Sequence, residues 1–232
     1  MAIFDPRKTA MTKADTFTPY QGKKISPEES LDRSKNFRDL MDKRRSIRFF
    51  SDRPVQKEII ENIMMTASSA PSGAHKQPWM FCAISTADLK HHIREAAEKE
   101  EYINYNGRMS DEWLEDLKKF DTDWNKEFID IAPWIIVVFK KTFDLDEEGN
   151  RHKNYYVNES VGIASGILIA AIHNAGLVTL THTPSPMNFL EKILERPKNE
   201  KAFLLLPVGY PADDALVPVL QRKSEEEVIK YY

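Results

Sequence analysis

Apolar residues along this chain follow two different spacings. Ile59, Ile60, Ile63 and Met64 recur at helical intervals, which predicts a helix over residues 55–69. Nearly continuous apolar runs instead predict buried strands at residues 79–85, 133–141, 177–183 and 202–210. Because helices alternate with these strands, we expect an α+β fold in which a central sheet carries helices on both faces.

Helix-start signals place further helices along the chain. Ser26 is suited to an N-cap, Pro27 to the first helical position and Glu29 to a capping box, so a helix is expected from there to about Asp42. The other expected helices lie at 86–106, within the highly charged residues 108–130, at 153–175 and at 186–195. Residues 1–25 are polar and are interpreted as an N-terminal arm, followed by one domain over residues 26–232.

Composition excludes several classes of function. The net charge is −3, which gives no reason to expect nucleic acid as a partner. The single cysteine, Cys82, excludes an internal disulfide framework and Cys-based zinc sites, fits a reducing cytoplasm, and is interpreted as buried and inert. No metal site is expected, and the lone His173 reads as a core histidine. The apolar run 161–172 is too short to span a bilayer, so no membrane partner is expected.

Three short motifs carry candidate chemistry, and each has a plainer interpretation. The cluster RRSIR contains Arg44, Arg45, Ser46 and Arg48, which could hold a phosphate by forked hydrogen bonds or form a solvated basic cluster at a helix end. The stretch APSGAH (70–75) could turn backbone N–H groups towards a ligand, or form an ordinary loop. Residues 181–183, THT, could offer hydroxyls at a strand end, or reflect strand propensity.

A fourth pattern combines opposite charges. Glu101 and Tyr105 are four residues apart and share a helix face, and Lys126 follows in the next charged segment. A charged surface helix is the plainer reading. If Glu101 and Tyr105 instead turn inward to a ligand, Glu100 and Asn104 lie on a neighbouring stripe that can stay in contact with water.

Taken in order, these motifs resemble the nitroreductase-like flavoprotein superfamily and, within it, the iodotyrosine deiodinases. The stretches that carry the resemblance are KRRSIRFFSDRPV, APSGAHKQPW, EEYINY, LKKFDTDWNKEF, NAGLVTLTHTP and LLPVGYP. The resemblance implies a nitroreductase-like fold with a mixed sheet, an intertwined homodimer, and one FMN per subunit at the dimer interface. It also implies an active-site lid at about residues 97–130.

The resemblance assigns roles to particular residues. The implied FMN contacts are Arg44, Arg45, Ser46, Arg48, Pro71, Ser72, Thr181, His182, Thr183 and Arg222, with Pro71 and Ser72 coming from the other subunit. Thr183 would donate to flavin N5, and the Ala74 backbone N–H would bind the phenolate oxygen of the substrate. Glu101, Tyr105 and Lys126 would bind the amino-acid end of a halotyrosine. His182 departs from the vertebrate pattern of threonine, with little effect expected if its side chain points away.

The implied activity is reductive removal of iodide or bromide from halotyrosines, through one-electron steps and a flavin semiquinone. The electron donor is external and unidentified, with NADP(H) as the family's expected carrier. A general NAD(P)H-dependent nitroreductase would share RRSIR without needing Glu101, Tyr105 and Lys126 together. A non-catalytic flavin-binding protein and a phosphopeptide or nucleic-acid binder are further alternatives, the last poorly supported by the net charge of −3. Vertebrate members carry a membrane anchor that is not expected here.

Overall fold

The computed structural model describes residues 17–232, so part of the predicted N-terminal arm lies outside the described residues. The chain divides into a short N-terminal unit ending at Asp39 and a main unit from Leu40 to Tyr232. Helix α2 (Pro27–Asp42) begins as predicted, since the backbone N–H of Glu29 donates to Ser26 Oγ over 3.2 Å. The arm and the domain boundary at residue 26 remain predictions.

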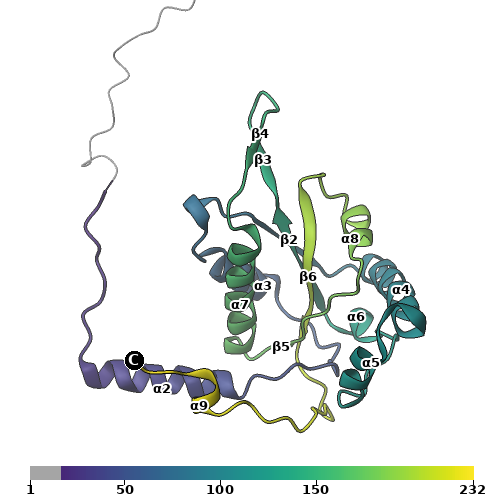
Figure 1. Cartoon of the computed structure of the whole chain (residues 1–232), viewed down its shortest axis with the longest axis horizontal. Coiled ribbons are helices and arrows are strands. Elements are labelled where there is room, and N and C mark those ends of the chain that lie inside the picture. Colours follow the sequence, from purple (N-terminus) through teal and green to yellow (C-terminus); the bar gives the residue numbers. More distant parts are fainter. Residues whose placement is uncertain (1–16) are drawn as a thin grey trace, which may run out of the picture. The chain divides into compact units, whose positions relative to one another are not determined.

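A four-stranded sheet forms the centre of the main unit (Figure 1). The strands are β1 (Trp79–Ile84), β2 (Trp134–Lys141), β6 (Glu200–Gly209) and β5 (Val178–Thr179), in the spatial order β1-β2-β6-β5. All three pairings between them are antiparallel. The predicted fold class is confirmed, but the parallel part of the mixed sheet is a single bridge between Ser46 and Thr179.

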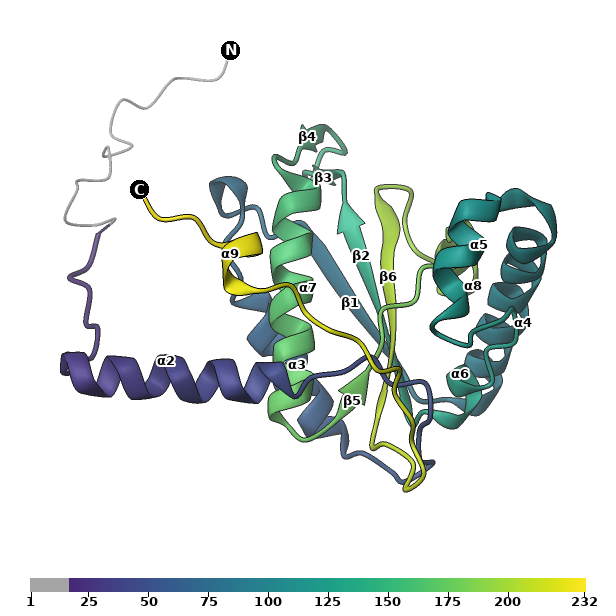
Figure 2. The ribbon, with the colours of Figure 1, turned by 60° about the horizontal axis from the view of Figure 1, so that its bottom comes forward.

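Helices cover both faces of this sheet, as the alternating pattern predicts (Figure 2). On one face lie α3 (Lys57–Ser68) and α7 (Val157–Asn174), and on the other lie α4 (Ala87–Ile103), α6 (Phe128–Ile131) and α8 (Asn188–Ile193). Strand β2 serves both cores because its side chains alternate: Ile136 and Val138 pack with α3 and α7, while Ile135 and Phe139 pack with α4 and α8.

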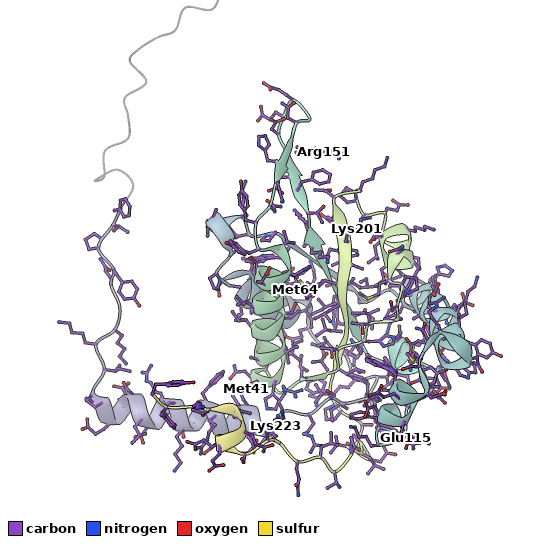
Figure 3. The ribbon with its side chains drawn as sticks, in the orientation of Figure 1. Met41, Met64, Glu115, Arg151, Lys201 and Lys223 are labelled. Carbon is purple, nitrogen blue, oxygen red and sulfur yellow. The ribbon has the colours of Figure 1, made fainter. Side chains whose placement is uncertain are left out.

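The remaining elements are short. They are the 3₁₀ turn η1 (Gly73–His75), the π-turn η2 (Asn104–Arg108), α5 (Asp111–Lys118), β3 (Phe143–Leu145), β4 (Arg151–Lys153) and α9 (Glu225–Val228). Strands β3 and β4 pair as a hairpin that projects beyond the sheet, with Arg151 marking it in Figure 3. Over residues 17–232, no helix has the length and apolar character needed to cross a bilayer. A cytoplasmic location stays a prediction.

Two predicted elements are shorter in the structure. The helix expected to run to Asn106 ends at Ile103, where η2 takes over and Gly107 adopts φ 144°. The strand expected over 177–183 pairs regularly only at Val178 and Thr179, and His182 forms an isolated bridge with Leu205. The regular pairing is therefore interrupted at Leu180 and Thr181, and both of these residues line a cavity.

Candidate active site

A cavity of about 650 Å³ lies where the arginine motif meets the C-terminal tail. Its lining comes from four chain segments, and the residues are Asp42, Arg44, Arg45, Ser46, Arg48, Phe120, Leu180, Thr181, Pro218, Leu220, Gln221 and Arg222. Six of the predicted FMN contacts are among them. Guanidinium groups and a hydroxyl around one cavity form a donor set that suits a phosphate-bearing group such as FMN.

Local pairing explains why these residues converge. The backbone N–H of Ile47 donates to Thr179 O over 3.2 Å, which ties the arginine motif to the edge strand β5. Arg222 fixes the tail, since its Nε donates to Asp42 Oδ1 over 3.0 Å and its guanidinium also reaches Arg44 O. Burial and the positive charges of Arg222 and Arg45 lower the pKa of Arg44. A bound anion would relieve this repulsion.

Arg48 links this cavity to a second one of about 470 Å³. Both cavities are lined by Arg48, Phe120 and Pro218, and the second extends along residues 119–128. The Arg48 guanidinium lies 5.8 Å from the centre of the Phe120 ring. Burial lowers the pKa of Arg48, while the nearby Tyr105 acts in the opposite direction. Arg48 therefore connects the anion-binding region electrostatically to the predicted substrate residues.

Glu101 and Lys126 form a buried ion pair, which the plainer interpretation of a charged surface helix did not anticipate. The carboxylate Oε2 and the ammonium Nζ are 3.4 Å apart, and the residues are only 7% and 3% exposed. The ammonium also donates to Asp123 O and lies 5.5 Å from the centre of the Tyr105 ring. Burial lowers the pKa of Lys126, opposed by the Glu101 charge, and burial raises the pKa of Tyr105.

The expectation that Asn104 stays in contact with water is wrong. Asn104 is 3% exposed, its Nδ2 donates to Ser185 O over 3.0 Å, and its Oδ1 accepts from Arg108. Glu100 is only partly exposed and pairs with the same arginine at 2.9 Å. The error arises because the helical face pattern does not reveal that the segment around Ser185, distant in sequence, lies against this face.

The THT motif divides between two environments. Thr181 and Thr183 are exposed, whereas His182 between them is buried against Phe128, with ring centres 5.7 Å apart. Backbone bonds to Leu205 hold His182 in this orientation, so its side chain does point away from those of the threonines. Its Nε2 has no hydrogen-bond partner in the described part of the chain. Burial, with help from the positive charges of Lys126 and Arg48, lowers the pKa of His182 to about 3.

The APSGAH loop is strained and offers a backbone donor. Ala74, His75 and Gln77 have φ values of 49°, 54° and 47°, a region that non-glycine residues seldom adopt. The N–H groups of Gly73, His75, Lys76 and Gln77 donate within the fold. Among the bonds of residues 17–232, the Ala74 N–H has no such acceptor. This is the group to which the resemblance assigns the phenolate.

The predicted cofactor contacts fall into two groups within one chain. Pro71 and Ser72, like Ala74, do not line the arginine cavity. Their loop is tied to the start of α7 through the Gly73 N–H and Ser160 Oγ, whereas His173 near the end of α7 bonds to Leu40 O beside the arginine motif. Thirteen residues of helix separate these anchors, a rise of about 20 Å.

Several candidate functional residues escaped the sequence reasoning, and Cys82 is less buried than expected. Phe120, Pro218 and Gln221 line the arginine cavity, yet only Arg222 of the tail was singled out. The signal that could have pointed to the tail residues is the long polar segment after the last strand. Cys82 is partly buried, and burial raises the pKa of its thiol. No metal-binding group occurs among the described residues.

Comparison with known proteins decides the family. Residues 41–210 match the model of the nitroreductase family. An iodotyrosine deiodinase of Haliscomenobacter hydrossis is 60% identical over 222 residues, which cover 96% of this chain and all of the relative. The chain belongs to the iodotyrosine deiodinases of the nitroreductase family. The Danio rerio iodotyrosine deiodinase is 50% identical, with 91% of this chain and 72% of that protein covered.

Solved structures agree with this membership. The crystal structure of oxidized iodotyrosine deiodinase bound to FMN and 3-iodo-L-tyrosine superposes with a TM-score of 0.71 and 29% identity, covering 84% of this chain and 98% of that one. A nitroreductase with bound FMN from Bacteroides fragilis shares the fold at a TM-score of 0.63 and 17% identity, covering 84% and 98% of the two chains. Iodotyrosine deiodinases and FMN nitroreductases thus share one architecture with this chain.

Proposed function

We propose that this protein is an FMN-dependent reductive dehalogenase that converts halogenated tyrosines into tyrosine and halide. The observation that carries the proposal is the buried Glu101–Lys126 pair beside Tyr105, which is joined through Arg48 to the arginine cavity. An iodotyrosine deiodinase structure with FMN and 3-iodo-L-tyrosine and a relative at 60% identity support the same activity.

The buried pair suits an amino-acid zwitterion. A bound halotyrosine would offer its ammonium to Glu101 and its carboxylate to Lys126 and the Tyr105 hydroxyl. The internal pair, at 3.4 Å, would then be exchanged for two pairs with the ligand, so neither charge is left alone. Exposed ion pairs contribute about 0–1 kcal/mol, but truncating one partner of a buried pair costs about 2–5 kcal/mol. Burial is therefore what makes these three residues a selective site.

The arginine cavity would hold the cofactor. Arg44, Arg45, Ser46 and Arg222 supply donors for the FMN phosphate, and Thr181 lines the same cavity. When bound, FMN in its reduced form supplies the two electrons that, with one proton, replace the carbon–halogen bond by carbon–hydrogen. The chain's own contribution is orientation: Thr183 would donate a hydrogen bond to the flavin, and the lid residues would exclude water.

The phenol end of the substrate would be met by a second copy of the chain. The Ala74 N–H has no acceptor among residues 17–232, but its loop is anchored at the far end of α7 from the arginine cavity. A homodimer in which Pro71, Ser72 and Ala74 of one copy complete the site of the other resolves this separation. An N–H bonded to the phenolate oxygen favours the ionised phenol, whose pKa an ortho halogen lowers.

An anaerobic single-turnover experiment tests this function. The bound flavin is reduced with dithionite and mixed with 3-iodo-L-tyrosine, and the expected result is flavin reoxidation with equal amounts of tyrosine and iodide. Nitrofurazone provides the comparison. In a general nitroreductase, the reduced flavin would be reoxidised by this nitro compound and not by 3-iodo-L-tyrosine. Reoxidation by the nitro compound without any tyrosine formation would overturn the proposal.

A further inference from the structure

One face of α4 is turned towards the segment that carries Lys126. The residues on this face recur at helical intervals and are Lys90, Arg94, Glu98 and Glu101. Lys90 Nζ donates to the backbone oxygens of Asp130 and Ala132 over 2.8 and 2.7 Å, which fixes α6 against α4. The charged face from Lys90 to Glu101 spans about three turns of the helix.

Glu98 contacts the main chain of the lysine whose side chain pairs with Glu101. Its Oε1 accepts a 2.8 Å hydrogen bond from the Lys126 backbone N–H. Lys126 lies between the end of α5 and the start of α6. Its backbone N–H therefore has no carbonyl acceptor within a helix of its own. The two glutamates are three residues apart on α4 and therefore hold Lys126 at two points, by its main chain and by its ammonium.

Arg94 holds the Glu98 carboxylate in place. Its Nε donates to the same Oε1 over 2.7 Å, and its other nitrogens donate to Asp130 Oδ2 over 3.0 Å and Asn125 Oδ1 over 3.1 Å. Asn125 directly precedes Lys126, and Asp130 belongs to α6. The Arg94 guanidinium therefore contacts the chain both beside Lys126 and within α6. Arg94 and Glu98 are about four-fifths buried, which limits competition from water.

The geometry points to Glu98, oriented by Arg94, as a positioning residue for binding of the amino-acid end of the halotyrosine. This inference rests on the proposed function. The Lys126 side chain is a flexible four-carbon stem, so the place of its ammonium depends on where its main chain is anchored. Loss of the anchor lets the ammonium move away from the substrate carboxylate, and a displacement of about 1 Å is enough to cost roughly a hundredfold in a well-oriented site.

The test compares two ligands that differ in one end. Equilibrium dissociation constants are measured by quenching of flavin fluorescence for 3-iodo-L-tyrosine and for 2-iodophenol, which lacks the amino-acid end. For Glu98→Ala we expect iodotyrosine binding to weaken between roughly tenfold and a hundredfold, with iodophenol and FMN binding unchanged. A general loss of structure would instead weaken all three.

Two glutamate variants serve as controls. Glu98→Gln keeps an oxygen acceptor for the Lys126 N–H and should recover most of the iodotyrosine affinity. Glu95→Ala removes a glutamate from the same helix whose contact is the exposed His91, at 3.6 Å, and should leave both ligands unaffected. If Glu98→Ala does not fold, Glu98→Asp carries the same expectation, because its carboxylate is withdrawn by one methylene.

A double mutant separates the two proposals. On a Lys126→Ala background, Glu98→Ala should add little to the loss of iodotyrosine affinity, because the residue it positions is absent. The positioning role would be overturned if the losses of iodotyrosine affinity in the double mutant were fully additive. It would also be overturned if Glu98→Ala weakened binding of both ligands equally, or if it kept wild-type affinity for iodotyrosine. Should Lys126→Ala itself bind iodotyrosine like the wild type, the proposed function fails, and the positioning role fails with it.

Discussion

The two regions proposed to contact the substrate are built in opposite ways. Around Lys126, the charges are buried and already paired inside one chain, at 3.4 Å between Nζ and Glu101 Oε2. Around Ala74, the loop is partly exposed, its backbone is strained, and one N–H has no acceptor among the described residues. The first region must exchange internal partners for ligand, whereas the second offers a donor that a neighbouring copy can use. Affinity and assembly can therefore be disrupted separately.

The largest effect is expected from the buried pair. Lys126→Ala or Glu101→Gln leaves one buried charge unpaired, so iodotyrosine binding should weaken by about 2–5 kcal/mol, with FMN retained. Flavin fluorescence titration measures this loss. The Lys118→Ala variant, at an exposed position of the same charged segment that lines neither cavity, is the matched control and should bind normally. Wild-type affinity in either pair variant would remove these residues from the site.

Mixing two inactive chains tests whether the Ala74 loop acts on the partner's site. Lys126→Ala breaks one region, and Ala74→Pro disrupts the other because proline has no N–H and cannot adopt the φ of 49° found there, so each homodimer should be inactive. Random mixed dimers contain one intact site, and the mixture should recover roughly a quarter of the wild-type deiodination rate. Iodide release is the measurement. No recovery, after mass spectrometry has shown that mixed dimers formed, would place both regions in the same copy.

Because of His182, the free energy of unfolding should decrease in acid. Its folded pKa of about 3 lies below its ordinary value of 6.5, because burial disfavours the charged form. Below pH 6.5 the unfolded chain takes up a proton that the folded chain refuses, so stability falls as the pH drops towards about 3, at up to about 1.4 kcal/mol per pH unit. Urea unfolding at several pH values should show a smaller slope for His182→Gln. Equal slopes would contradict the assignment.

The smallest effect is expected at the strained loop. Ala74→Gly removes the left-handed strain at φ 49° but adds freedom to the unfolded chain, so the net gain in stability should be below about 1 kcal/mol. Because glycine keeps the backbone N–H, iodotyrosine affinity should stay unchanged. Thermal melting and the same fluorescence titration measure the two effects. A large loss of affinity would mean that the alanine methyl, and not the N–H, contacts the ligand.

Local patterns predicted most of the fold because the forces behind them are local. Ser26 begins α2 by accepting from Glu29, and Ile135 and Ile136 on β2 face opposite cores as strand periodicity requires. The burial of Asn104 could not be read in the same way, because it depends on Ser185, distant in sequence, whose carbonyl oxygen accepts from the Asn104 amide. Periodicity predicts which residues share a helix face, but not which other segment covers that face.

The candidate site residues could be picked out by type, but their environments could not. The pattern of Glu101, Tyr105 and Lys126 names residues that do lie close together, yet its local reading as a surface helix missed the burial of Glu101 and Lys126. His182 is buried because of two residues that are distant in sequence. Leu205 pairs with its backbone, and Phe128 packs against its ring. No sequence signal pointed to Glu98, because its contact is with the backbone N–H of Lys126, which lies outside any helix. Tertiary packing decides such details.

The sheet separates two apolar cores, and this has a consequence for how the molecule opens. Helices α4, α6 and α8 pack in one core, and α3 and α7 pack in the other. Local unfolding can therefore proceed on one side as a sub-global event with its own free energy. Amide protons of α4 and α6 can therefore exchange with solvent independently of those of α7, so that one side of the sheet opens while the other stays folded.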